Sequence, residues 1–248
     1  MSPKKGLDKY RPRPAWIRYL LSYIALFLGK ILFKITIKGQ KNIPRKGPYI
    51  IAGNHFTVFD PPLVILAIKK PISFLAASDM KVNWYENLGL WLYGFIPTNR
   101  AQLAPSTIKK ARKVLKQNNI LGIFPEGNTE SSTLRKAKPG VVYLSTMEKV
   151  KILPIGIYGL KQNPINYILS GIRPKISIKI GKTFGPLKLP LDKSERDKAL
   201  EHIGKEVMLN IAALVPDDCH GEYSGDSLIN DIRRAVSYTH LRAHETIA

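Results

Sequence analysis

The chain has 248 residues, of which 44% are hydrophobic and 23% charged, so it can form one large domain with its own core, and wholesale disorder is excluded. Thirty-nine Lys and Arg residues against 18 Asp and Glu residues give a net charge of +21, which predicts an anionic partner such as a nucleic acid, an anionic membrane or a phosphorylated substrate. The single cysteine, Cys219, excludes an internal disulfide and a cysteine-rich zinc site.

The first predicted element is a helix over residues 14–33, inside a strongly basic segment. Residues 1–46 carry twelve basic residues and one acid, so about half of the net charge lies there. The apolar run at residues 19–29 is too short for a membrane-spanning helix, which needs about 20 apolar residues. We therefore predict a helix that lies in the interface of an anionic membrane, with basic side chains on lipid headgroups. The expected aromatic anchors are Trp16, Tyr19 and Tyr23. The alternative is a buried core helix with a solvated basic face.

Short apolar runs then alternate with helical patterns along the chain. Strands are predicted over residues 35–37, 48–53, 73–77, 120–124, 151–158 and 175–180. Helices are predicted over residues 60–69, 80–93, 106–117, 140–146 and 194–214. Asp60 is expected to be the N-cap of its helix, with Pro61 at the first helical position. The alternation predicts an α/β fold, with a single domain whose mixed, largely parallel sheet is flanked by helices.

One histidine lies where open α/β sheets bind their ligands. His55 directly follows a predicted buried strand, and Asp60 comes five residues later at a helix start. A carboxylate on one ring nitrogen fixes the tautomer of a histidine and stabilises the imidazolium, which leaves the other nitrogen as a general base. Taken alone, however, this spacing is more typical of a polar loop residue followed by a helix cap.

Two further segments carry polar groups at strand ends or turns. Glu126 lies in FPEG (residues 124–127), directly after a predicted strand, and Arg100 follows the break GFIP (residues 94–97). An arginine held by a rigid turn suits a phosphate, because its guanidinium can bond two oxygens at once. Taken alone, FPEG is more typical of an ordinary strand-ending turn, and the alternative for Arg100 is a solvated surface arginine.

Four segments occur together and in a characteristic order. They are NHFTVFD (residues 54–60), GFIPTNR (94–100), FPEG (124–127) and ILPIGI (152–157). In this combination the chain resembles the glycerolipid acyltransferases of the 1-acyl-glycerol-3-phosphate acyltransferase type, over residues 14–223. The ending LVPDDCHGEY (residues 214–223) also resembles the end of that family.

The resemblance implies transfer of a fatty acyl group from acyl-CoA or acyl carrier protein to the free hydroxyl of 1-acyl-glycerol-3-phosphate, which gives phosphatidic acid. His55 would be the general base and Asp60 would orient it, without an acyl-enzyme, a metal or a cofactor. The sequence contains no G-x-S-x-G nucleophile elbow, which agrees with direct transfer. The residues expected to bind the acceptor are Arg100, Glu126, Gly127, Asn128, Lys136 and Lys138. The residues expected to support the motifs are Asn54, Gly94, Phe124, Pro125 and Pro154, with Pro154 shaping the acyl-donor side.

One departure from the family concerns the acceptor. The family usually continues FPEG with Thr-Arg-Ser, whereas residues 128–131 here read Asn-Thr-Glu-Ser, so the expected arginine is absent. Arg135, Lys136 or Lys138 could supply the missing positive charge. Alternatively, the acceptor is another lysolipid or glycerol-3-phosphate.

The expected organisation has three parts: a membrane-associated segment (1–34), the catalytic domain (35–223) and an unstructured tail (224–248). Residues 236–248 resemble a translated sequencing adapter more than a natural terminus. The expected location is the cytoplasmic face of the cell membrane, peripheral and monotopic. The expected partners are an anionic membrane surface, a lysophospholipid and an acyl-CoA or acyl carrier protein. Nucleic-acid binding is the distant alternative, because no RNP1-like or zinc-finger pattern occurs.

Overall fold

The structure of the chain is a computed structural model. It describes residues 12–77, 84–98, 104–127, 129, 131–160 and 169–235. Arg100, Asn128 and the suspected adapter sequence at residues 236–248 lie outside the described residues.

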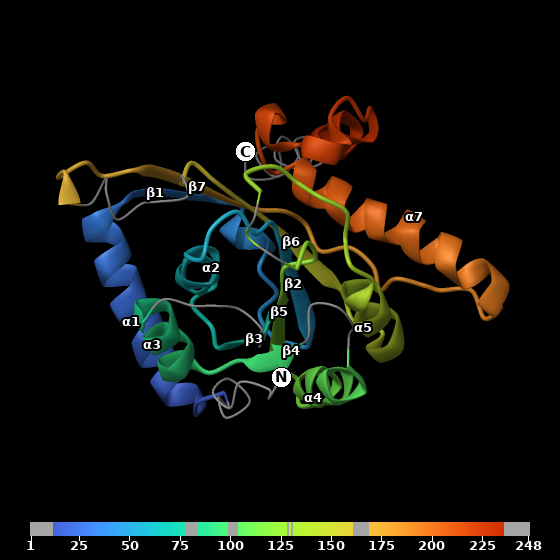
Figure 1. The fold of residues 1–248 in the computed structure, drawn as a ribbon, viewed down its shortest axis with the longest axis horizontal. Coiled ribbons are helices and arrows are strands. Elements are labelled where there is room, and N and C mark those ends of the chain that lie inside the picture. Colours follow the sequence, from blue (N-terminus) through green and yellow to red (C-terminus); the bar gives the residue numbers. More distant parts are fainter. Residues whose placement is uncertain are drawn as a thin grey trace, which may run out of the picture.

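A seven-stranded sheet runs through the protein in the order β1-β7-β6-β2-β5-β3-β4 (Figure 1). Its strands are β1 (Lys34–Lys38), β2 (Tyr49–Gly53), β3 (Ile72–Ala77), β4 (Ile96–Thr98), β5 (Ile120–Ile123), β6 (Ile152–Tyr158) and β7 (Lys175–Ile180). Only β6 and β7 pair antiparallel, so β1 and β7 run against the other five strands. Every residue of β2 and β5 is buried, which explains their uninterrupted apolar sequences. The prediction of a mixed, largely parallel sheet is confirmed.

Helices cover both faces of this sheet (Figure 1). The α-helices are α1 (Ala15–Leu32), α2 (Asp60–Ile68), α3 (Trp84–Tyr93), α4 (Pro105–Lys116), α5 (Gly140–Glu148) and α7 (Lys193–Ala212). The described part of the chain also forms the short 3₁₀ helices η2 (Gln40–Asn42), η3 (Asp217–Cys219) and η4 (Gly221–Tyr223). One hydrophobic core lies between the sheet and α2, and a second lies between the sheet and α4, α5 and α7. The single α/β domain with flanking helices is therefore as predicted.

The structure corrects the sequence-based predictions at two places. Residues 96–98 form β4, a strand that the prediction treated as part of a break. Pro97 obscured it, but a proline is tolerated on an edge strand, and β4 is the edge of the sheet. The expectation of an unstructured tail is wrong for residues 224–235, because residues 228–235 are helical and Ile229 is only 2% exposed. The remaining division into three parts stays a prediction.

Helix α1 packs along the protein on one side and exposes apolar side chains on the other. Arg18, Ser22 and Gly29 are buried, and α1 contacts α2, α3 and β1. The exposed apolar side chains are Trp16, Tyr19, Leu20, Tyr23, Ile24, Phe27, Leu28 and Ile31. Within the described part of the chain, α1 is the one helix that is long and apolar enough, by length and composition, to cross a membrane. The prediction of an apolar N-terminal helix is confirmed, and the alternative of a buried core helix is wrong.

Arg18, a basic residue of the predicted interfacial helix, is buried against the domain. Its guanidinium Nη1 donates to the backbone carbonyl of Ile72 and to the hydroxyl of Ser73, both at 3.3 Å. These contacts join α1 to the start of β3, so this basic residue anchors the helix to the domain instead of facing lipid.

Candidate active site

The chain is fastened to the sheet at the point where it leaves β2. Asn54 is fully buried, and its side-chain amide donates to the carbonyl of Ile157 while its Oδ1 accepts from the N–H of Ile157, both at 2.7 Å. This reciprocal pair ties the end of β2 to β6. The backbone of the next residue, His55, is therefore held at the carboxyl end of the sheet.

The structure brings His55 and Asp60 together. His55 Nδ1 lies 3.2 Å from Asp60 Oδ2. The carboxylate is 1% exposed and also accepts two hydrogen bonds from Thr57, from the N–H at 2.8 Å and from the hydroxyl at 3.1 Å. Because three donors surround the carboxylate, its burial leaves no charge without a partner.

Asp60 reaches the histidine in a way that the cap prediction missed. Helix α2 starts at Asp60 itself, with Phe59 as N-cap, and the N–H of Asp60 donates to the carbonyl of Thr57. This turn points the carboxylate back toward Thr57 and His55, so it does not cap the helix. Its place in the first helical turn still stabilises the negative charge through the helix dipole.

The imidazole of His55 contacts Asp60 and Phe124 and is partly exposed to solvent. It stacks on Phe124 with a centroid distance of 4.2 Å, and its side chain is 15% exposed. With Nδ1 directed at Asp60, Nε2 is the nitrogen that can accept a proton from an approaching hydroxyl. The arrangement can therefore act as a general base whose tautomer is set by a buried carboxylate.

The buried side chain of Glu126 links the loop after β5 to the loop after β2. Its side chain is fully buried, and its Oε1 accepts from the N–H of His55 at 2.9 Å while Oε2 accepts from the N–H of Arg135 at 3.2 Å. Burial raises the pKa of Glu126 to about 7, although the hydrogen bonds from His55 and Arg135 lower it. This carboxylate faces the protein interior, so in this conformation it positions the backbone of His55 and does not meet an acceptor directly.

Gly127 and Lys138 form the rim of this turn. Gly127 has a φ of +79°, and a Cβ there would lie 2.8 Å from Cε and 3.0 Å from Nζ of Lys138. The N–H of Lys138 also donates to the carbonyl of Pro125 at 2.8 Å. The Lys138 side chain therefore crosses directly over Gly127, where a glycine leaves room for it. Arg135 lies next to the same turn, with its Nε 3.9 Å from Glu126 Oε2.

Three other predicted residues, Lys136, Pro154 and Gly94, make their described contacts with residues other than His55. Lys136 points at Glu201 of α7, at 3.4 Å, and both side chains are 74% exposed, so the structure does not bring Lys136 to the turn. Pro154 is the register partner of Ala52 within the sheet. Gly94, with a φ of +76°, ends α3 by donating its N–H to the carbonyl of Leu90. Thr57 was missed by the sequence prediction, and its only signal is a hydroxyl residue three positions before Asp60.

Comparisons with known proteins agree with this architecture. The model of the family described as Acyltransferase matches residues 34–158, which contain β1 to β6 and both motif loops. A solved structure, the 1-acyl-sn-glycerophosphate (LPA) acyltransferase PlsC from Thermotoga maritima, is similar with a TM-score of 0.52 and 20% identity. That similarity covers 76% of this chain and 78% of that one, and it supports the fold.

Curated proteins with similar sequences are named as acyltransferases. A 1-acyl-sn-glycerol-3-phosphate acyltransferase of Borreliella burgdorferi is 31% identical over 169 residues, which is 67% of each chain. A protein of that name from Bacillus subtilis is 28% identical over 50% of this chain and 63% of its own length. A probable enzyme of the same name from Mycoplasma pneumoniae is 26% identical over 59% of this chain and 58% of its own. The chain belongs to the acyltransferase family.

Proposed function

We propose that the protein transfers a fatty acyl group from an acyl thioester to the free hydroxyl of 1-acyl-glycerol-3-phosphate, which yields phosphatidic acid. The observation that carries the proposal is the His55–Asp60 pair, with the carboxylate buried and held by Thr57 and with the ring partly open to solvent. The relatives that bear this activity in their names support the choice of reaction.

The proposed reaction proceeds in one displacement. Nε2 of His55 takes the proton of the acceptor hydroxyl as its oxygen attacks the thioester carbonyl carbon, and Asp60 stabilises the resulting imidazolium. The tetrahedral intermediate then collapses with cleavage of the carbon–sulfur bond, and the imidazolium returns its proton to the departing thiolate. The products are the ester and a free thiol, so the step needs no metal, no cofactor and no acyl-enzyme, and acyl-CoA or acyl carrier protein acts as co-substrate.

The proposed phosphate site lies on the rim of the FPEG turn. Lys138 crosses Gly127, and Arg135 approaches the same turn from the following loop. These two cations would take the place of the arginine that the family carries after FPEG, with Arg100 and Asn128 completing the site as the resemblance implies. Glu126 would hold both loops in register by its two backbone hydrogen bonds.

The proposed location is one leaflet of an anionic membrane, on the cytoplasmic face. The buried side of α1 is fixed to the domain by Arg18, while its opposite side is apolar and aromatic. A helix that packs on its own domain along one side cannot also be surrounded by lipid, so it favours lying in the interface over crossing it. An acceptor embedded in that leaflet could then reach the protein without leaving the membrane.

An acyl-transfer assay over a panel of acceptors tests the function. Purified protein would receive an acyl thioester of CoA or of acyl carrier protein, together with lysophosphatidate, glycerol-3-phosphate or a lysolipid without a phosphomonoester. We expect phosphatidate as the main product and at least a tenfold preference for lysophosphatidate. A preference for glycerol-3-phosphate or for another lysolipid would move the function within the family, and no transfer from either donor to any acceptor would overturn the proposal.

A further inference from the structure

The loop that carries the proposed phosphate ligands has no regular structure of its own. Residues 131–138 lie between the FPEG turn and α5 and form neither a helix nor a strand. Such a loop takes its conformation from the groups that bond its backbone. Within the FPEG turn, Glu126 accepts the N–H of Arg135 and a backbone carbonyl accepts the N–H of Lys138. These two bonds fix the loop on the side of the candidate active site.

A segment near the end of the described chain bonds the same loop from the other side. Residues 216–223 follow α7, and Figure 1 shows them among the red elements beside the loop that leads into α5. The N–H of Leu134 donates to the carbonyl of Cys219 at 2.9 Å, and the N–H of Glu222 donates to the carbonyl of Leu134 at 3.2 Å. Both main-chain groups of Leu134, which directly precedes Arg135, are therefore bonded to the 216–223 segment.

Tyr223 adds a side-chain contact at the next position of the loop. Its side chain is buried, and its hydroxyl donates a long hydrogen bond of 3.5 Å to the carbonyl of Arg135. Burial raises the pKa of Tyr223 to about 12, so the hydroxyl keeps its proton and remains a donor at neutral pH. The segment thus bonds the backbone of Arg135 as well as that of the residue before it.

Gly221 lets the segment approach the loop closely. It has a φ of +53°, and a Cβ there would lie 2.3 Å from the carbonyl oxygen of Leu134 and 2.9 Å from the hydroxyl oxygen of Thr133. Ordinary contacts of a Cβ begin at 3.4 Å. Any larger residue must therefore displace the loop or the segment by about 1 Å.

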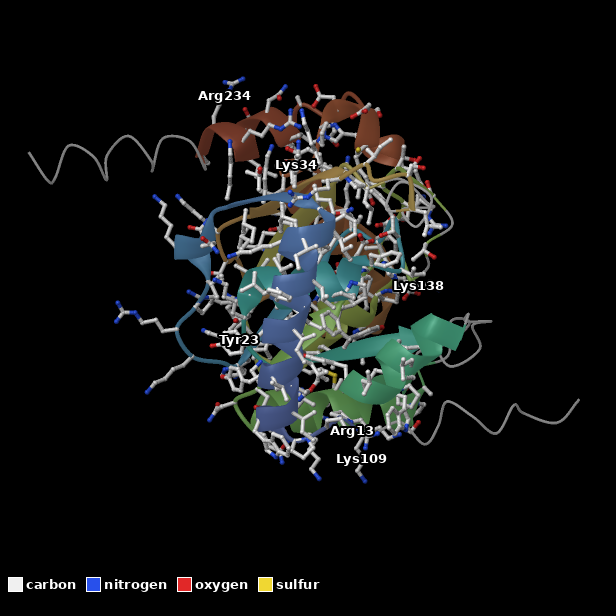
Figure 2. All side chains as sticks on the ribbon, turned by 90° about the vertical axis from the view of Figure 1, so that its left-hand side faces the viewer. Arg13, Tyr23, Lys34, Lys109, Lys138 and Arg234 are labelled. Carbon is white, nitrogen blue, oxygen red and sulfur yellow. The ribbon has the colours of Figure 1, made fainter. Side chains whose placement is uncertain are left out.

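Arg233, in the helical turns that follow the segment, fixes it to the end of α7. Its Nη2 donates to the carbonyl of Val215 at 2.8 Å, and its Nε donates to the carbonyl of Ala213 at 3.3 Å. Its Nη1 lies 2.8 Å from Asp217 Oδ1. The side chain of the next residue, Arg234, points away from the protein instead (Figure 2). Because Arg233 holds the segment, a clash at the glycine should displace the loop.

We propose that the 216–223 segment positions the cations that bind the phosphate of the acceptor, with Gly221 and Tyr223 as positioning residues that act through the 131–138 loop. The inference rests on the proposed function, because the cations of this loop are its proposed phosphate ligands. Misplacing a binding group by about 1 Å can cost on the order of a hundredfold in rate. The segment thus sets the affinity for the acceptor, while the histidine and its carboxylate perform the transfer.

The test compares Gly221→Ala with the matched control Gly225→Ala. Gly225 also has a positive φ, of +78°, but a Cβ there would meet nothing within 4 Å. Both variants place an alanine on a left-handed backbone and share that strain, whereas only Gly221→Ala presses on Leu134. A second variant, Tyr223→Phe, removes one hydroxyl and leaves the buried ring in place. The full-length proteins are compared by steady-state kinetics with lysophosphatidate and acyl-CoA, by their unfolding midpoints and by hydrogen exchange over residues 131–138.

We expect Gly221→Ala to raise the KM for lysophosphatidate about tenfold and to speed hydrogen exchange in the 131–138 loop. Its kcat and its KM for acyl-CoA should stay within about threefold of the unmodified protein, because the histidine and its carboxylate lie outside this loop. Tyr223→Phe should raise the KM for lysophosphatidate about threefold without changing the unfolding midpoint. Gly225→Ala should keep the KM and the loop exchange of the unmodified protein.

A KM for lysophosphatidate that is unchanged in both Gly221→Ala and Tyr223→Phe would overturn the proposal. An equal rise in Gly225→Ala, or a fall in kcat without a rise in KM, would also overturn it, because either result would reduce the segment to a general contribution to stability. If Gly221→Ala does not fold, the KM of Tyr223→Phe decides. Failure of the unmodified protein to transfer acyl groups to lysophosphatidate would instead refute the proposed function, while hydrogen exchange would still show whether the segment holds the loop.

Discussion

Glutamine in place of Glu126 should make the protein more stable at pH 8 and less active. In the unmodified protein both carboxylate oxygens accept a backbone N–H, from His55 and from Arg135. Glu126→Gln keeps one acceptor but turns an NH₂ group toward the other N–H. One buried N–H then faces an NH₂ group, as it faces an O–H group when Glu126 is protonated, and the backbone of His55 is free to shift. A displacement of this kind should lower kcat/KM about tenfold to a hundredfold.

The stability effect has the opposite sign because the charge is buried. Burial raises the pKa of Glu126 to about 7 from an ordinary value of 4.5, so the folded protein holds this proton more tightly than the unfolded chain. The free energy of unfolding therefore falls as pH rises from about 4.5 to about 7, by roughly 3 kcal/mol, and this group changes it no further above that range. Glutamine carries no such charge, so the variant should lose no stability across that window.

Urea unfolding followed by tryptophan fluorescence at pH 5 and pH 8 would measure the difference. The unfolding free energies of the two proteins should be nearly equal at pH 5, where Glu126 is protonated. At pH 8 the variant should be more stable by about 1–3 kcal/mol. Glu201→Gln, which changes an exposed carboxylate, is the matched control and should show no such pH dependence. A Glu126→Gln variant that is less stable than the parent at pH 8, or fully active, would refute the role of Glu126 as a buried positioning carboxylate.

Further predictions concern the acceptor, the histidine and the membrane. Thr57→Val removes one hydrogen bond from the carboxylate that orients the histidine and should lower kcat about tenfold, with recovery in Thr57→Ser; a kcat within twofold would contradict this role. Lys138→Gln should raise the KM for lysophosphatidate about tenfold while Lys136→Gln leaves it unchanged, as steady-state kinetics would show; equal effects would remove Lys138 from the site. Trp16→Ser combined with Phe27→Ser should lower partitioning into anionic vesicles at least tenfold in a flotation assay without changing the unfolding midpoint, because both side chains are exposed; unchanged flotation would refute the membrane role of α1.

Features set by local sequence could be predicted well. The apolar runs of β2 and β5 are buried in the centre of the sheet, and the five-residue spacing from His55 to Asp60 closes through one turn at Thr57. Periodicity and short spacing determine such features, because the residues that interact are near neighbours in the chain.

Features that depend on distant partners could not be predicted in this way. Glu126 accepts a hydrogen bond from the N–H of a residue 71 positions away. Its position in the sequence suggested an exposed residue that binds the acceptor, whereas in the fold it is buried and positions the backbone of His55. Arg18 is a basic flank by sequence, yet its guanidinium bonds β3 more than fifty residues later. Lys175 and Lys179 read as ordinary solvated positions until the register places them beside the lysines of β1. Pairing across the fold decides each of these cases, and no local pattern encodes it.

The most direct test of the account is the rate of acyl transfer to lysophosphatidate in His55→Ala, with His202→Ala on the exposed side of α7 as the control. Loss of the general base should lower kcat/KM about a thousandfold while the variant keeps its vesicle binding and its unfolding midpoint, and His202→Ala should match the unmodified protein. A His55→Ala variant that transfers acyl groups within tenfold of the unmodified rate would contradict the mechanism.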